Sequence, residues 1–276
     1  MSRLWLGWIV ALTACGGGDV DDGVTDEVLS VGGVHACHVD VDGVLTCWGG
    51  NNRGQLEVPE GLTWKTVDAG MDHTCGLTLD GGLRCWGQGA PSAEGTYDEV
   101  SAGGGITCVR GGSTVSCFGV EAPSDWTMAS AGVDHACGLD GGGVITCVGD
   151  DRYGQSTAPT GPMSAVAAGE AHTCALDRGG QIACWGNDDL GQLQAPAGAF
   201  EALTAGPTHS CVLDADGAVS CWGQDARGMA TPPADAFRQI SAGRSNTCGV
   251  LVEGGVVCWG ADGDGQSTPP MVRSEG

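Results

Sequence analysis

Cysteine and histidine recur in one fixed arrangement along this chain. Fourteen of the 15 cysteines form seven pairs with nine residues between partners, or eight in the third pair. A histidine stands two residues before the first cysteine in five of the seven units, and Ile106 and Asn246 take its place in the other two. Thiols at such spacing either form disulfides or bind metal ions. The pairs are Cys37 with Cys47, Cys75 with Cys85, Cys108 with Cys117, Cys137 with Cys147, Cys174 with Cys184, Cys211 with Cys221, and Cys248 with Cys258.

Disulfides fit the pairs better than zinc does. Three ligands in one unit would leave a zinc ion open, and two units lack the histidine. If paired cysteines lie opposite each other on a β-hairpin, the third residue of the connecting loop is glycine in six units, as a three-residue hairpin loop requires. The third unit is left with the two-residue loop Gly112-Ser113. The six glycines are Gly43, Gly81, Gly143, Gly180, Gly217 and Gly254.

The repeated histidines are interpreted as structural, because a catalytic base needs one special copy and not five equivalent ones. His38 stands outside the repeat and is expected at the surface. Acidic clusters at Asp150-Asp151, Asp188-Asp189 and 262–264 are interpreted as solvated loop carboxylates. None matches a complete calcium-loop pattern, and whether they bind calcium is left open.

The elements that position these residues are three short strands per unit. A run of small residues ends in Ala-Gly, and two strands carry the cysteines. Because the third strand runs parallel to the first, the segment after each Trp-Gly must lead the chain back. The Ala-Gly-x-x-His loops and the Gly-Gln loops then share one face, with the glycine turns on the other. Seven such sheets predict an all-β, seven-bladed β-propeller with the small-residue run innermost.

The repeated pattern Ala-Gly-x-x-His…Leu…Gly…Trp-Gly-x-Asn-x-x-Gly-Gln resembles the repeat of the regulator of chromosome condensation (RCC) family. The short units are similar to its bacterial branch, which includes a secreted β-lactamase inhibitor propeller. The resemblance covers about residues 26–270 and implies the propeller fold. It implies little about function, because the family's members do unrelated things on one scaffold.

The N-terminus predicts export. A charged start and a short apolar run end in Leu12-Thr13-Ala14-Cys15, which resembles the lipobox of bacterial lipoproteins. The predicted organisation is a signal peptide at 1–14, a lipidated Cys15 with an acidic linker at 15–25, and the propeller at 26–276. Gly16 favours the outer membrane under the sorting rule of well-studied relatives. Whether the tail at 270–276 adds a closing strand is left open.

The formal net charge of −23 disfavours nucleic acid and anionic lipid as partners. We expect a monomer that binds no cofactor and no metal, contacts the membrane only through Cys15, and presents the Gly-Gln loops to a protein partner. The alternative is a hydrolase or lyase acting on envelope polymers with an acidic site in the central channel, for which Glu170 is the candidate. The predicted partner-binding residues are Asn51, Asn52, Arg53, Asp151, Arg152, Tyr153, Asn187, Asp188, Asp189, Asp225, Arg227, Asp262 and Asp264.

Overall fold

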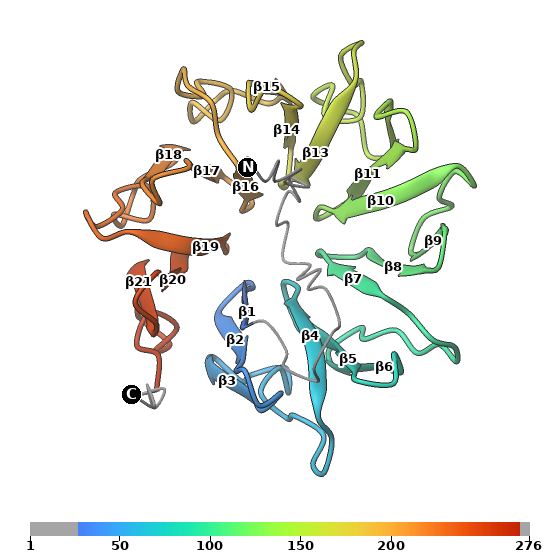
Figure 1. The fold of residues 1–276 in the computed structure, drawn as a ribbon, viewed down its shortest axis with the longest axis vertical. Coiled ribbons are helices and arrows are strands. Elements are labelled where there is room, and N and C mark those ends of the chain that lie inside the picture. The colour runs from blue at the N-terminus through green and yellow to red at the C-terminus, as the bar shows by residue number, and fades with distance from the viewer. Residues whose placement is uncertain (1–26, 271–276) are drawn as a thin grey trace, which may run out of the picture.

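Residues 27–270 form a ring of seven three-stranded antiparallel sheets in a computed structural model of the protein (Figure 1). Each sheet, or blade, is built from three consecutive strands. The seven-bladed all-β propeller predicted from the sequence is therefore confirmed. No helix long and apolar enough to cross a membrane occurs in these residues. The predicted signal peptide, Cys15, linker and C-terminal tail lie outside the described part of the chain.

The first strand of each blade lies nearest the centre, as the small-residue run predicts. The inner strands are β1 (Val28–Val31), β4 (Trp64–Ala69), β7 (Glu99–Ala102), β10 (Trp126–Ala131), β13 (Met163–Ala168), β16 (Ala202–Ala205) and β19 (Phe237–Ala242). The middle strands are β2 (His35–Val39), β5 (His73–Thr78), β8 (Thr107–Gly111), β11 (His135–Asp140), β14 (His172–Asp177), β17 (His209–Leu213) and β20 (Asn246–Leu251). The outer strands are β3 (Leu45–Gly49), β6 (Leu83–Gly87), β9 (Thr114–Phe118), β12 (Ile145–Gly149), β15 (Ile182–Gly186), β18 (Val219–Gly223) and β21 (Val256–Gly260).

The cysteine hairpins have the predicted register. In all seven blades the two cysteines lie directly opposite each other on the middle and outer strands, with Cα–Cα distances of 4.0 to 4.1 Å. The predicted pairing is therefore confirmed. The disulfides join Cys37 to Cys47, Cys75 to Cys85, Cys108 to Cys117, Cys137 to Cys147, Cys174 to Cys184, Cys211 to Cys221, and Cys248 to Cys258.

The turns and the bridges agree with the sequence-based expectations in two further ways. The six predicted turn glycines have φ between 74° and 91°, a conformation that glycine adopts at little cost. Seven disulfides are typical of a protein that matures in an oxidising, extracellular compartment. The compartment predicted from the N-terminus thus has support from the propeller itself.

A ring of hydroxyl groups joins the inner strands. In five blades a Ser or Thr two residues before the Ala-Gly glycine accepts a hydrogen bond from a backbone N–H of the next blade. Asp68 does the same in the second blade, and only Ala167 in the fifth blade has no oxygen to offer. The N–H groups at the inner edges of the sheets are thus satisfied by neighbouring blades. The hydroxyl residues are Ser30, Ser101, Ser130, Thr204 and Ser241.

Replacing Ala167 by Ser is expected to stabilise the protein. Ala167 is buried, and a hydroxyl there would give the Ala205 N–H the acceptor that the equivalent N–H groups have. One such hydrogen bond contributes about 1 kcal/mol. The measurement is the free energy of unfolding in denaturant, with Ser130→Ala as the matched control, which should lose about 1–3 kcal/mol. Equal stability of Ala167→Ser and wild type would contradict the role of the ring.

The repeated histidines also join blades. Each ring Nε2 lies 2.7 to 2.9 Å from a Thr or Ser hydroxyl that follows the histidine position of the next blade. The two units without histidine confirm this role. In the blade after Ile106 the hydroxyl position holds Ala136, and in the blade after Asn246 it holds Ala36. Where the imidazole is missing, the next hydroxyl is missing too. The pairs are His35–Thr74, His73–Thr107, His135–Thr173, His172–Ser210 and His209–Thr247.

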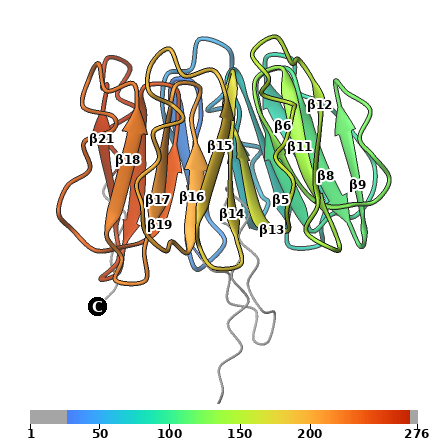
Figure 2. The ribbon, with the colours of Figure 1, turned by 90° about the horizontal axis from the view of Figure 1, so that it is seen from above.

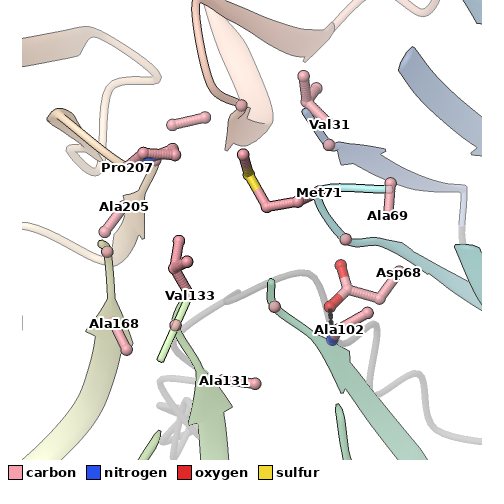
Figure 3. A pocket seen from close by; sticks show the side chains of 18 of the residues that line it. Val31, Asp68, Ala69, Met71, Ala102, Ala131, Val133, Ala168, Ala205 and Pro207 are labelled. Carbon is pink, nitrogen blue, oxygen red and sulfur yellow. Dashed lines mark hydrogen bonds between the residues drawn. The ribbon is translucent and has the colours of Figure 1, made fainter. Parts of the chain in front are cut away.

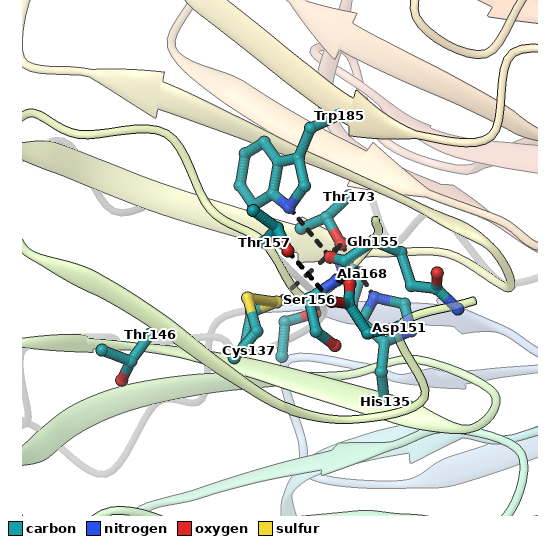
Figure 4. The surroundings of a disulfide bond; sticks show 12 residues. His135, Cys137, Thr146, Asp151, Gln155, Ser156, Thr157, Ala168, Thr173 and Trp185 are labelled. Atoms are coloured by element: carbon teal, nitrogen blue, oxygen red, sulfur yellow. Dashed lines mark hydrogen bonds between the residues drawn. A yellow bond between two sulfur atoms is a disulfide. The ribbon is translucent and has the colours of Figure 1, made fainter. Parts of the chain in front are cut away.

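The repeated tryptophan of the hairpins depends on the Gly-Gln loop of the preceding blade (Figure 4). The indole N–H of Trp185 donates to the Gln155 carbonyl at 2.8 Å, and the Thr173 hydroxyl donates to the same oxygen at 2.9 Å. Blades 2 and 3 lack this loop, and the blades that follow them carry Phe118 and Val148 in place of tryptophan. A side chain without an N–H therefore stands wherever the acceptor is absent.

Blades 7 and 1 close the ring through side chains. The Gln239 amide exchanges two hydrogen bonds with the backbone of Leu29, at 3.2 and 3.3 Å, and Arg238 forms an ion pair with Glu27. The Trp48 indole donates to the Gln266 carbonyl, as at the other interfaces. Since every blade is built from consecutive strands, the described residues close the ring without exchanging a strand between blades.

The expectation that His38 lies at the surface is wrong, because its side chain is 2% exposed. In blades 2, 4 and 7 a glycine occupies the equivalent position and an inner-strand aromatic ring covers it, as Trp64 covers Gly76. Blade 1 begins at Val28 without such an aromatic ring, and the imidazole fills the place, 3.9 Å from the Glu27 carboxylate. Burial lowers the pKa of His38 below its usual value, with Glu27 opposing the shift.

Candidate functional site

The two faces of the ring differ, as the topology predicts (Figure 2). The loops between inner and middle strands and the loops after the outer strands lie on one side, which we call the loop face. The tight glycine turns lie on the opposite side, the hairpin face. Strand β1 starts beside the turn after Val39, since Val28 pairs with Val39, so the described chain begins on the hairpin face.

The complete Gly-Gln loops are held by two kinds of internal contact. An Asp or Asn side chain at its start accepts the N–H five residues later, at 2.8 to 2.9 Å. The buried Gln side chain near its end accepts the N–H two residues before it in four of the five loops. Five predicted partner-binding residues therefore have a structural role in their own loops. They are Asn51, Asp151, Asp188, Asp225 and Asp262.

These contacts also explain the acidic clusters. The Asp151, Asp225 and Asp262 carboxylates each accept a threonine hydroxyl in addition to a backbone N–H. The Asp150 carboxylate accepts hydrogen bonds from the side chains of Arg152 and Gln155. The Asn187 amide donates to Asp189 and accepts from Gln192. Among residues 27–270, no three or more His, Cys, Asp or Glu side chains are grouped as a metal site would require.

The remaining predicted residues point to solvent at the loop tips. The two residues that follow the Asp or Asn at the loop start differ between blades and are exposed, whereas that Asp or Asn and the buried Gln or Met hardly vary. Tyr153 is 54% exposed, a high value for an aromatic side chain. Blades 2 and 3 carry no complete loop, so the tips occupy only five-sevenths of the face. The exposed tip residues are Asn52, Arg53, Arg152, Tyr153, Asp189, Arg227 and Asp264.

An open groove of about 460 Å³ crosses the loop face at blades 6 and 7. Arg227 and Asp264 from the predicted set line it, together with Glu170 and Arg244. Its size lies within the range of about 300–1,000 Å³ that ligand pockets have. The groove brings together loops from blades 5, 6, 7 and 1, a combination that the sequence does not indicate.

A second, smaller cavity of about 90 Å³ occupies the centre of the ring, lined by inner-strand ends from all seven blades (Figure 3). Asp68 is the one carboxylate in its lining, at a position where the other blades carry Ser, Thr or Ala. Its oxygens accept the Ser30 hydroxyl and the Ala102 N–H, both at 2.6 Å. Burial raises the pKa of Asp68 to about 7, and these hydrogen bonds oppose the shift.

Sequence reasoning missed Asp68. The channel alternative predicts a carboxylate that breaks the repeat and has a raised pKa, and Asp68 meets that description better than Glu170, which is exposed. Aligning the residues two before each Ala-Gly glycine would have revealed the substitution. In the same alignment the counterpart of Glu170 in the first blade is Gly33.

Replacing Asp68 by Ser is expected to stabilise the protein more at pH 8 than at pH 5. The folded-state pKa of about 7 lies above the ordinary value of 3.8, so the stability that a protonated Asp68 contributes is lost as pH rises from 3.8 through 7. At about 1.4 kcal/mol per pKa unit, the gain from the substitution should grow by roughly 2–3 kcal/mol between pH 5 and pH 8. Denaturant unfolding of both proteins at each pH measures it. A gain independent of pH would contradict the raised pKa.

Comparison with known proteins supports the repeat assignment. The family model described as "Regulator of chromosome condensation (RCC1) repeat" matches residues 64–90, 163–192, 200–228 and 237–266. Four of the seven blades are thus RCC1-type repeats, and they include the blades with complete loops at 191–192, 228–229 and 265–266. No curated protein matches the chain.

Solved propellers of low sequence identity have the same fold. The receptor kinase CR4 ectodomain of Physcomitrella patens is 26% identical, with a TM-score of 0.72 over 84% of this chain and 72% of that one. The CRINKLY WD40 ectodomain of the receptor kinase ACR4 from Arabidopsis thaliana is also 26% identical, with a TM-score of 0.70 over 86% and 95%. Prp20p of Saccharomyces cerevisiae, 18% identical with a TM-score of 0.51 over 85% and 72%, shares the fold alone.

Proposed function

We propose that this RCC1-repeat propeller is a non-catalytic binding module, anchored through Cys15 to the outer membrane of the bacterial cell envelope, and that it presents its loop face to a protein partner. The observation that carries the proposal is the distribution of sequence variation. Positions that join the blades repeat around the ring, whereas the exposed loop tips differ from blade to blade. Variable side chains on a rigid scaffold are typical of recognition surfaces.

The direction of the chain supports this arrangement. Because Glu27 lies on the hairpin face, a tether ending at Cys15 would hold that face toward the membrane and leave the loop face turned outward. The twelve residues 15–26 can span at most about 40 Å when extended. The similar propellers of CR4 and ACR4 are receptor ectodomains, a setting in which the fold is also displayed outside a cell.

The channel enzyme is less well supported. The cavity beside Asp68 holds about 90 Å³, well below the size of pockets that enclose a substrate. Hydrolysis of a glycosidic polymer generally uses two carboxylates, and Asp68 is the one carboxylate among the described residues that line the cavity. Its contacts with Ser30 and Ala102 instead link blades 1, 2 and 3.

The test has two stages. The chain with Cys15→Ser, oxidised and folded, is used to capture proteins from envelope and culture extracts, with a reduced and alkylated copy as control. Affinity for the captured protein, once purified, is then compared between two double variants, each of which reverses the charge of two arginines. Arg152→Glu/Arg227→Glu alters the loop face and Arg84→Glu/Arg178→Glu the hairpin face.

We expect at least a tenfold loss of affinity for the loop-face variant and little change for the hairpin-face variant. The reverse pattern would show that the partner binds the hairpin face. Failure of the oxidised chain to retain any protein would count against a protein-binding function and turn attention to polymers.

A further inference from the structure

The loops of blades 6 and 7, where the groove lies, carry small residues at their tips. Ala226 and Gly263 stand where the other complete loops carry Asn52, Arg152 and Asp189. The loop of blade 6 nevertheless keeps its place, since the Met229 carbonyl accepts the Thr247 hydroxyl at 2.9 Å and the Trp259 indole at 3.0 Å. The opening is therefore built into a well-anchored part of the face.

The loop of blade 6 also differs in its hydrogen bonding. In the other four complete loops, the side-chain oxygen of the buried Gln accepts the N–H two residues before it. The Met229 side chain has no oxygen, so the Arg227 N–H lacks the side-chain acceptor that its counterparts have. The loop of blade 6 is thus held without the side-chain contact that the other four complete loops have.

Two arginines line the groove of this strongly acidic protein. Arg227 and Arg244 both line it and both are exposed, and within residues 27–270 neither forms an ion pair, whereas Arg152 and Arg238 do. Ser245 adds a hydroxyl. The oxygen of the Gln224 amide accepts the Thr208 hydroxyl at 2.9 Å, which leaves the Gln224 amide N–H groups as donors.

Two carboxylates limit what these donors can bind. Glu170 lines the groove from blade 5 and Asp264 from blade 7. Their charges would repel a polyanion such as a phosphate-rich polymer, but a single carboxylate can be accommodated between two guanidinium groups, which bind carboxylates in a bidentate manner. The arrangement thus favours an isolated acidic side chain over a dense array of negative charge.

We propose that this groove binds one carboxylate group of the partner protein, an Asp or Glu side chain or the chain terminus, between Arg227 and Arg244. The proposal rests on the proposed function and names the chemistry of its recognition site. Arg227 supplies one guanidinium, and Arg244 supplies the second from the rim of the central cavity.

The first test uses small probes and needs no partner. The Cys15→Ser chain, with labelled arginine side chains and backbone amides, is titrated in NMR with acetyl-Ala-Glu-Ala-amide, with its Gln counterpart, with acetyl-Ala-Ala (a free terminal carboxylate) and with inorganic phosphate. We expect saturable shifts at Arg227 and Arg244 with a carboxylate peptide, none with the Gln peptide, and none at Arg178 on the hairpin face. The two carboxylate peptides distinguish a side chain from a chain terminus.

Variants make the assignment specific. Arg227→Gln/Arg244→Gln should weaken peptide binding at least tenfold, and Asp264→Asn should strengthen it two- to threefold by removing repulsion. Arg178→Gln is the matched control and should leave binding unchanged. Shifts with phosphate but with neither carboxylate peptide, or equal shifts with the Gln peptide, would overturn the proposal.

The second test separates this inference from the proposed function. If the captured partner binds Arg227→Gln/Arg244→Gln as tightly as wild type while loop-face variants outside the groove, such as Arg152→Glu/Tyr153→Ala, bind weakly, the groove assignment fails and the binding module stands. If the double Gln variant loses the partner at least tenfold and melts like wild type, both are supported. A carboxylate peptide that binds when no protein is captured would support the groove and count against a protein partner.

Discussion

Reduction of the seven disulfides is expected to unfold this protein in buffer without denaturant. Each disulfide joins cysteines nine or ten positions apart, and closing a loop of that length stabilises a folded chain by about 2–3 kcal/mol. The combined contribution of seven, roughly 14–21 kcal/mol, is as large as or larger than the total stability of about 5–15 kcal/mol that most domains have. Each three-stranded blade, moreover, cannot bury its hydrophobic faces without its neighbours.

The measurement is tryptophan fluorescence and circular dichroism after reduction and alkylation, compared with the oxidised chain. Removing a single pair, by replacing both Cys174 and Cys184 with Ala, gives a graded version of the experiment. The melting temperature should fall by roughly 5–10 °C if the loss is about 2–3 kcal/mol. A reduced chain that keeps its native spectrum would show that the contacts between blades suffice for folding.

Acid is expected to destabilise the protein well above the pH at which carboxylates titrate. Burial lowers the pKa of His35, His135 and His209 to about 4 and that of His172 to about 3. Their Nδ1 atoms are buried without a hydrogen-bond partner, so a second proton on the ring would find no acceptor. A depressed histidine pKa contributes stability that is present above about 6.5 and is lost as pH falls toward the folded-state value.

The size of the effect follows from the shifts. Between pH 7.5 and pH 5 each of these four histidines should lower the free energy of unfolding by roughly 2 kcal/mol. Protonation of Asp68 should raise it by about 3 kcal/mol over the same range. We therefore expect a net loss of roughly 5 kcal/mol between pH 7.5 and pH 5. The free energy of unfolding in denaturant, with the disulfides intact, measures it.

His172→Asn provides the control, because Asn246 already occupies the equivalent position in blade 7. The variant should be less stable than wild type at pH 7.5, but the difference should shrink by roughly 2 kcal/mol at pH 5, since one group no longer resists protonation. A difference that is the same at both pH values would mean that His172 titrates normally in the folded protein.

Local features of the fold were predictable from the sequence. Glycine at a left-handed turn position and cysteines at fixed distances on either side determine hairpin register, because both constraints act within ten residues. The small-residue run was correctly placed at the centre, where neighbouring strands approach most closely. The structural interpretation of the histidines is also confirmed, although repetition alone did not identify their partners.

The candidate site was less predictable. All thirteen predicted residues lie on the loop face, but Asp151 and its four counterparts support their own loops through hydrogen bonds to the backbone five residues later. The groove is formed by loops from blades 5, 6, 7 and 1, which meet only in the folded ring. His38 was wrongly expected at the surface. It is buried in a place that an aromatic ring covers in blades 2, 4 and 7, and blade 1 has no such ring.

The sequence by itself therefore determined the number of blades, the strands in each and the disulfide pairing, since these follow from turn geometry and side-chain spacing within one repeat. Only the tertiary structure decided which residues meet across blades, such as His172 with Ser210 or Asp68 with Ser30 and Ala102, at separations of 34 to 38 positions. The same packing raised the pKa of Asp68 and brought Arg227 and Arg244 into one groove. Burial and charge at these sites arise from neighbouring blades, and no single repeat contains them.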